Sequence, residues 1–215
     1  MILYHNSKNR DRLLRKEKFD KPPFDYVRFI TEILESIAQN KTTGIIHINE
    51  NYRQTTHPRF LGNGVYCYDN YPNAVEFSST GKVVLITYED EKTILLDLDN
   101  PLVMDEIRET LENQAEDKIK LLFQKDPDTL ARVLLLVELI KTFIYEDFEQ
   151  FEPGVGILLF VLYEYLKMPK DDIVSKTFFN MVNSRHEKYY LLQNYSRDKV
   201  KCISIPIEEE GEVNG

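Results

Sequence analysis

The stretch that decides the fold of this chain is Gly62-Asn63-Gly64-Val65-Tyr66-Cys67-Tyr68-Asp69, followed closely by Ala74, Val75, Glu76 and Phe77. Val65 to Cys67 is a run of β-forming residues and predicts a strand. Gly62 and Gly64 lack side chains, so a ligand or another strand can come close to the backbone there. A helix is expected from Pro72 to Ser78, with Asn70 or Tyr71 near its cap.

A second segment, at the N-terminus, completes this pattern. Ile2 to Tyr4 predicts a short strand, and the strand ends in His5, Asn6 and Ser7. A strand that ends in His-polar-Ser therefore precedes a strand with the sequence Gly-x-Gly-aliphatic-Tyr.

These two segments together resemble the NAD-binding core of the ADP-ribosyltransferases. The more similar branch is the diphtheria-toxin and poly(ADP-ribose) polymerase type, whose triad reads His, Tyr and usually Glu. The resemblance covers residues 1–8, 60–98 and 187–205. It implies an α+β fold in which split antiparallel sheets surround an NAD cleft.

The resemblance also implies roles for the N-terminal residues. His5 is expected to contact the ribose 2′-hydroxyl of NAD, and Ser7 matches the family serine of this segment. Asn6 stands where the family commonly has a glycine that grips the carboxamide through its backbone. Asn tolerates unusual backbone angles better than most residues. A buried structural histidine at position 5 is the alternative interpretation.

On the second strand, Tyr66 matches the triad tyrosine that packs along the nicotinamide, and Gly64 provides the close backbone approach. Phe77 stands where a second family ring stacks on the opposite face of the nicotinamide. Ala74 replaces a serine that bonds the carboxamide in many members. Alternatively, Tyr66 and Phe77 are ordinary core aromatics, and the glycines form a simple turn.

The third triad position is expected in the segment Glu187-Lys188-Tyr189-Tyr190-Leu191-Leu192-Gln193-Asn194. Aligning the aliphatic pairs places Tyr189 where the family has its glutamate. Glu187 precedes it by two residues and therefore lies on the same face of a strand. Either a bulge shifts the strand register and Glu187 serves as the third triad residue, or the triad glutamate is absent from this chain. Glu187 as a surface residue beside Arg185 is a further alternative.

The remaining sequence predicts a helical insertion between two β-rich parts of a single domain, residues 1–215. Apolar spacing predicts a helix over 24–38. The helical insertion is expected over 101–183, with a helix start at Asp126-Pro127 and a last helix capped by Asp171 or Asp172 and running to Met181. Further expected elements are strands at 45–48, 83–88, 93–98, 189–194 and 200–205, a loop at 49–59, a turn at 89–91 and a disordered acidic tail at 208–215.

Composition limits the classes of partner. The net charge of −9 disfavours a broad surface for duplex nucleic acid, although Lys8, Arg10, Arg12, Arg15, Lys16 and Lys18 could form a local basic groove or a solvated face. Two cysteines without CxxC spacing and isolated histidines predict no metal site. The chain shows no secretion signal and no membrane-spanning run, which favours the reduced cytoplasm.

The resemblance implies a mono-ADP-ribosyltransferase that uses NAD as substrate and modifies a protein or nucleic-acid acceptor. The absence of a clear triad glutamate argues against polymerase activity that builds chains of ADP-ribose. Small cytosolic members are often toxins of toxin–antitoxin or anti-phage systems, and the helical insertion would then bind an antitoxin or regulatory protein.

Three alternatives remain. The chain could be an inactive relative that binds a nucleotide or a protein. It could also be a helical interaction module whose β-rich parts bind nothing. Finally, Phe77-Ser78-Ser79-Thr80 with Glu89 and Glu91 resembles elements of the Arg-Ser-Glu branch of the superfamily, but the gap between them is too short.

Overall fold

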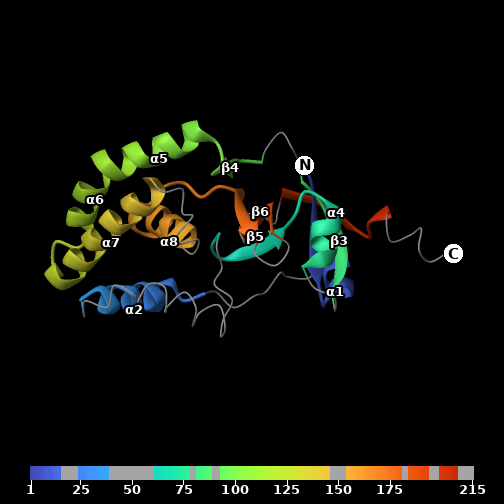
Figure 1. Ribbon diagram of the computed structural model, residues 1–215, viewed down its shortest axis with the longest axis horizontal. Coiled ribbons are helices and arrows are strands. Elements are labelled where there is room, and N and C mark those ends of the chain that lie inside the picture. Colours follow the sequence, from blue (N-terminus) through green and yellow to red (C-terminus); the bar gives the residue numbers. More distant parts are fainter. Residues whose placement is uncertain are drawn as a thin grey trace. The chain divides into compact units, whose positions relative to one another are not determined.

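The computed structural model describes residues 1–15, 24–38, 61–77, 81–88, 93–145, 154–180, 184–193 and 199–207 (Figure 1). The chain divides into two compact units. One comprises residues 1–22, 63–99 and 171–215 and contains the strands. The other comprises residues 23–62 and 100–170 and contains the longer helices.

The first sheet of the β-containing unit has three antiparallel strands in the order β1-β3-β7. They are β1 (Ile2–Ser7), β3 (Lys82–Tyr88) and β7 (Val200–Ser204). His5 lies opposite Val84 in this sheet, so its side chain shares a face with Leu3, Val84 and Ile86. The short helix α1 (Arg10–Leu14) contributes Leu13 to the core on this face.

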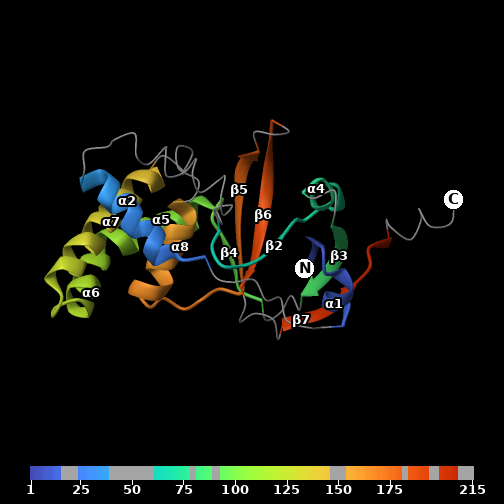
Figure 2. The same cartoon turned by 90° about the horizontal axis from the view of Figure 1, so that it is seen from below.

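The second sheet has four strands in the order β2-β6-β5-β4. They are β2 (Gly64–Cys67), β6 (Arg185–Gln193), β5 (Ile173–Asn180) and β4 (Leu95–Asp97). Figure 2 shows β5 and β6 as the two long neighbouring strands of this sheet. The expected α+β class with two sheets is confirmed, but β4 runs parallel to β5, so the second sheet is mixed rather than antiparallel.

The expected helix over 171–181 is wrong for residues 173–180, and residues 181–183 of the expected insertion lie outside the described residues. Residues 173–180 form β5, which pairs along its length with β6. The sequence Ile-Val-Ser-Lys-Thr-Phe-Phe is dominated by β-branched and aromatic residues, which favour a pleated, half-buried surface. Asp172 does not cap a helix either: its carboxylate accepts a hydrogen bond from the Ile94 backbone N–H at 2.8 Å, beside the start of β4.

A β-bridge between Tyr4 and Tyr68 connects the two sheets. The backbone N–H of Tyr4 donates to the carbonyl of Tyr68 at 2.8 Å, and the N–H of Tyr68 donates to the carbonyl of Tyr4 at the same distance. Helix α4 (Tyr71–Glu76) follows at once, and Asn70 caps it by accepting the Asn73 N–H at 3.0 Å. The predicted strands at 2–4, 65–67 and 83–88 and the predicted capped helix after Asn70 are therefore confirmed.

The helical unit contains α2 (Tyr26–Ala38), α5 (Pro101–Asn113), α6 (Ala115–Leu122), α7 (Pro127–Tyr145), α8 (Gly154–Phe160) and a π-helical segment (Val161–Tyr165). The predicted helix over 24–38 is confirmed. The predicted helix start at Asp126 is also confirmed, because Asp126 accepts hydrogen bonds from the backbone and the hydroxyl of Thr129. Among the described residues, no helix is long and apolar enough to cross a membrane.

Several predictions fall on residues outside the described ranges. They are the strand at 45–48, the loop at 49–59, the turn at 89–91, the acidic tail at 208–215, His47, His57, Lys16, Lys18 and the competing motif at Ser78 to Thr80 with Glu89 and Glu91.

Candidate functional site

The structure brings His5 and Tyr66 together. His5 Nδ1 lies 2.7 Å from the carbonyl oxygen of Tyr66, and the two residues come from β1 and β2, the strands that the Tyr4–Tyr68 bridge joins. Because a carbonyl oxygen only accepts, Nδ1 carries the proton of this hydrogen bond. In the neutral ring, Nε2 is then a hydrogen-bond acceptor. His5 is only 5% exposed, so its ring is held in a fixed orientation.

Asn6 and Ser7 make local contacts. The Asn6 side-chain amide donates to the carbonyl of Ala74 at 2.8 Å and so ties β1 to α4. Its Oδ1 occupies the space that a side chain at Gly81 would need. The Ser7 hydroxyl accepts from the Asn9 backbone N–H at 3.1 Å. Both side chains therefore hold the backbone that follows His5 in place.

Gly62 and Gly64 are needed for two different physical reasons. Gly62 has φ of 103°, a conformation that other residues rarely adopt, so it is required by a turn. A Cβ on Gly64 would lie 2.3 Å from the carbonyl oxygen of Leu192. The close backbone approach expected at Gly64 is thus made by strand β6.

Glu187 is buried, not on the surface as one alternative had it. It is 4% exposed, and both of its oxygens are held. Arg185 Nε donates to Oε1 at 2.9 Å, and the Tyr189 hydroxyl donates to Oε2 at 3.0 Å. Arg185 also donates to Asn73 and to Glu76 of α4, at 2.7 and 2.6 Å. This charge therefore has the partner that a buried carboxylate needs.

The strand that carries Glu187 has no bulge. β6 keeps a constant register against β5 from Arg185 to Leu192, so Tyr189 and Glu187 stay two residues apart on one face. Tyr66 lies opposite Leu191 on the neighbouring strand, and it shares this face. A shifted register is therefore excluded, so Tyr189 keeps the position aligned with the family glutamate, and Glu187 lies two residues before it on the same face.

An aromatic cluster surrounds the carboxylate, and its central ring is one that the sequence did not single out. Tyr68 is 2% exposed, and its ring centroid lies 5.2 Å from that of Tyr189 and 6.0 Å from that of Phe77. Burial, and then the neighbouring Tyr189 and Glu187, raise the pKa of Tyr68 far above its usual value. Phe77 is 60% exposed, so its ring is open to contact by another molecule. The sequence could have indicated this ring, because Tyr68 follows Tyr66 by two residues and extended segments place such side chains on one face.

The opposite face of the second sheet carries a polar network that no sequence motif indicated. Asp97 accepts from the Ser175 hydroxyl at 3.0 Å and from Lys188 Nζ at 2.9 Å. Asp99 accepts from the backbone and the hydroxyl of Thr177. It also pairs with the buried Lys176, which lies opposite Tyr189 and therefore on the same face as Glu187. Burial alone would raise the pKa of Asp99, but the Thr177 hydrogen bonds and the lysine charges outweigh it and lower the pKa. This network joins β4, β5 and β6 and is structural.

The described histidines and cysteines do not form a metal site. His186 is exposed and its ring packs on Phe179 at 5.2 Å. Cys67 is buried and Cys202 is exposed. Within the described ranges, no three His, Cys, Asp or Glu residues are placed to hold a metal ion.

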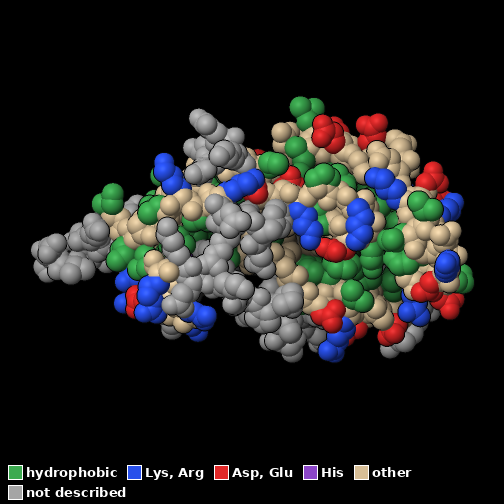
Figure 3. Space-filling model, turned by 180° about the vertical axis from the view of Figure 1, so that it is seen from behind, with side chains coloured by type: hydrophobic (Ala, Val, Ile, Leu, Met, Phe, Trp, Pro, Cys, Tyr) green, Lys and Arg blue, Asp and Glu red, His purple; other side chains and the backbone are tan. Residues whose placement is uncertain are grey.

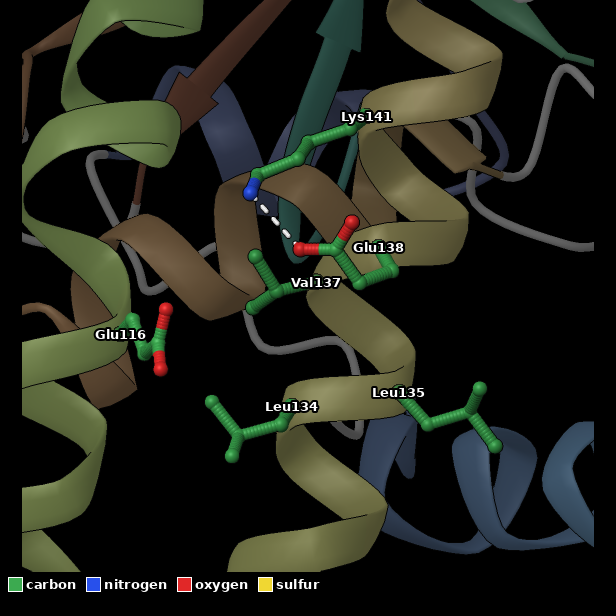
Figure 4. A pocket seen from close by; sticks show the side chains of 6 residues that line it. All are labelled: Glu116, Leu134, Leu135, Val137, Glu138 and Lys141. Carbon is green, nitrogen blue, oxygen red and sulfur yellow. Dashed lines mark hydrogen bonds and ion pairs between the residues drawn. The ribbon is translucent and has the colours of Figure 1, made fainter.

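The helical unit has a hollow of its own, of about 260 Å³, between α6 and α7. Figure 4 shows Leu134, Leu135 and Val137 of α7 beside it, with Glu116 reaching in from α6. Glu138 and Lys141 complete its wall and form an ion pair at 2.7 Å. None of the candidate residues of the β-containing unit lines it.

Comparisons of the chain with protein-family models, curated proteins and solved structures found no match.

Proposed function

We propose that this protein is a mono-ADP-ribosyltransferase that takes NAD as its substrate. The observation that carries the proposal is the hydrogen bond at 2.7 Å from the His5 ring to the backbone carbonyl of Tyr66, which holds β1 beside β2 although the two residues are 61 positions apart. A buried, oriented carboxylate, Glu187, lies on the same face of the second sheet as Tyr66. His, Tyr and Glu on three neighbouring strands are the groups that the reaction needs.

In the proposed reaction, the bond between the ribose carbon and the nicotinamide nitrogen breaks, and nicotinamide leaves with the electron pair. Positive charge develops on the ribose, and a nearby carboxylate stabilises it. A nucleophile of the acceptor then bonds to the ribose carbon and loses its proton to Glu187 or to solvent. His5 would hold a ribose hydroxyl, and the rings of Tyr66 and Phe77 would hold the nicotinamide.

The fixed orientation of Glu187 supports this role. Arg185 and Tyr189 hold its two oxygens, so the carboxylate does not reorganise as charge develops on the substrate. The same two contacts also favour a second candidate function. If Arg185 neutralises Glu187 completely, the protein would bind NAD or another nucleotide without transferring ADP-ribose.

The test is incubation of the purified protein with labelled NAD and a cell lysate, beside a His5→Ala, Tyr66→Ala double variant. Label transferred by the wild type and not by the variant is the expected result. Sensitivity of the labelled product to protease or nuclease then identifies the acceptor class. Absence of transfer, with NAD still raising the melting temperature of the wild type alone, would support the nucleotide-binding alternative. Absence of both signals would contradict both functions.

The proposal extends to a cellular role. A toxin of a toxin–antitoxin or anti-phage system in the cytoplasm would need a protein that restrains it. The hollow between α6 and α7 has an apolar floor and charged edges, which suits an antitoxin or regulatory protein on the helical unit. Co-expression with a neighbouring gene product that relieves toxicity, and loses this effect with Leu134→Asp, would support that role.

A further inference from the structure

One side chain of β6, Arg185, contacts both the candidate carboxylate and the helix that leads to Phe77. Arg185 Nε donates to the buried carboxylate of Glu187 at 2.9 Å. Its Nη2 donates to Asn73 Oδ1 at 2.7 Å and to Glu76 Oε2 at 2.6 Å, and both of these acceptors belong to α4. Because the guanidinium is a rigid, planar group, its contacts at Nε and Nη2 hold β6 and α4 in a fixed relation.

The two residues of α4 that Arg185 contacts lie in the turn that leads to Phe77. The Asn73 carbonyl accepts from the Phe77 N–H at 3.2 Å, and Glu76 comes directly before Phe77 in the chain. With six residues, α4 is too short to be stable alone, since isolated helices below about 12 residues are marginal in water. Asn70 caps its first turn, and Arg185 holds its last turn, which carries the exposed ring of Phe77.

The ion pair of Arg185 with Glu187 differs from the pairs on the surface. Figure 3 shows Lys and Arg side chains beside Asp and Glu side chains over much of the face in view. Glu116 and Lys120 of α6 form such a surface pair, and both of their side chains are more than half exposed. Exposed pairs of this kind contribute little to stability. The side chain of Glu187 is only 4% exposed, so Arg185 is tied firmly to it.

We infer that Arg185 is a positioning residue that holds the ring of Phe77 and the carboxylate of Glu187 in one fixed arrangement. The inference deepens the proposed function and, as to catalysis, rests on it: the ring would hold the nicotinamide while the carboxylate stabilises the ribose from which nicotinamide leaves. A displacement of either group relative to the other would lower the rate, because the orientation of the bound groups contributes much of the acceleration. The positioning itself needs neither NAD nor transfer and can be measured separately.

The test variant is Asn73→Ala, Glu76→Gln, which removes both contacts of Arg185 with α4. It leaves the buried pair of Arg185 with Glu187 in place, so no buried charge loses its partner. Alanine has a higher helix propensity than asparagine, and glutamine is similar to glutamate. A loosened α4 would therefore result from the lost contacts and not from the helix propensity of the new residues. If this variant does not fold, Glu76→Gln alone takes its place.

The matched control is Asn113→Ala, Glu116→Gln in the helical unit. It makes the same two changes at the same spacing and reaches the same net charge, but it breaks only an exposed pair. Hydrogen exchange of the Phe77 amide, measured by NMR without NAD, reports on the last turn of α4. Thermal melting confirms that both variants fold.

The protection of the Phe77 amide should be about tenfold lower in the test variant than in the wild type, and unchanged in the control. Where the wild type transfers ADP-ribose, kcat/KM for NAD should fall by about 10- to 100-fold in the test variant, with an increased KM. A merely structural role would reduce the amount of folded protein and leave KM unchanged.

Unchanged protection of the Phe77 amide in the test variant would overturn the inference, because α4 would then be held without Arg185. Equal losses of protection in the test variant and the control would also overturn it, since they would show a response to net charge alone. Lower protection in the test variant, with no transfer by the wild type, would leave this inference standing and remove the proposed function. Transfer by the wild type, with unchanged protection in the test variant, would do the reverse.

Discussion

The carboxylate of Glu187 is the most constrained acidic group in the candidate site. One oxygen is bound by Arg185 and the other by Tyr189, and the side chain is almost fully buried. Removing one partner of a buried charge pair is costly, because the remaining charge has no solvent to compensate it. The residue must therefore be tested by a change that preserves its shape.

Glu187→Gln makes that change. If the proposed function holds, transfer should fall at least 100-fold, since the developing positive charge loses its counter-charge. NAD should still raise the melting temperature, because the rings and His5 remain. Transfer and thermal shift, measured with NAD, check the two effects. Asp97→Asn is the control, an acid on the opposite face of the same sheet. Equal rates for Glu187→Gln and wild type would show that Glu187 is structural.

Asp99 predicts a dependence of stability on pH. Its lowered pKa means that the folded state binds the proton less tightly than the unfolded state does. Its contribution is therefore present above the usual aspartate pKa of about 3.9 and is lost as the pH falls through the lower folded value. Asp99→Asn should reduce the free energy of unfolding by about 1–3 kcal/mol at neutral pH. The difference from wild type should disappear in acid.

Urea unfolding across this pH range checks the prediction. Asp105→Asn is the control, because Asp105 forms an exposed ion pair with Arg108 that contributes little. A difference between Asp99→Asn and wild type that persists unchanged below the folded pKa would contradict the assignment.

At the scale of residues, the sequence located the groups but not their partners. His5 and Tyr66 could be placed together because each lies in a strand that the local sequence predicts and that the family resemblance pairs. The contacts of Arg185 with Asn73 and Glu76 of α4 could not, because these residues lie 112 and 109 positions away in the chain. Side-chain contacts over such separations depend on how the elements pack, which strand patterns do not encode.

At the scale of elements, the pairing of β2 with β6 determines where Tyr66 lies relative to Glu187. Gly64→Ala should weaken this pairing, because the added Cβ would meet the Leu192 carbonyl at 2.3 Å and backbone cannot easily move aside. We expect a loss of about 1–3 kcal/mol in the free energy of unfolding. Urea unfolding measures it.

Gly154→Ala is the matched control, a buried glycine at the first position of α8, where alanine is favoured. It should change stability less than Gly64→Ala does. If Gly64→Ala were as stable as wild type and lost only NAD binding, the glycine would serve the ligand and not the strand.

The type of a secondary-structure element was predictable wherever one spacing of apolar residues dominated the local sequence. The strand at β2, the capped helix α4 and the helix start at Asp126 followed from local patterns. Residues 171–181 were misread because Asp171-Asp172 looks like a helix cap, whereas Asp172 binds the Ile94 N–H. The sequential strands β3 and β4 also lie in different sheets, and this depends on long-range packing.

At the scale of the molecule, the two compact units divide the tasks that we propose. The β-containing unit carries the candidate site, and the helical unit carries the hollow between α6 and α7. The chain crosses between the units more than once, so neither unit is a continuous segment. Truncation is therefore a poor test of this division, and point substitutions in each core are better.

Leu136 and Ile86 provide such a pair, since both are fully buried, one in α7 and the other in β3. Each change to Ala should lower the free energy of unfolding by about 2–5 kcal/mol. If NAD binds the β-containing unit, Leu136→Ala should keep the wild-type affinity for NAD below its melting temperature. Ile86→Ala should weaken it, because Ile86 shares a sheet face with His5. Calorimetric titration with NAD at low temperature distinguishes the two variants. Weaker NAD binding in Leu136→Ala than in Ile86→Ala would place the NAD site on the helices and contradict the proposed division.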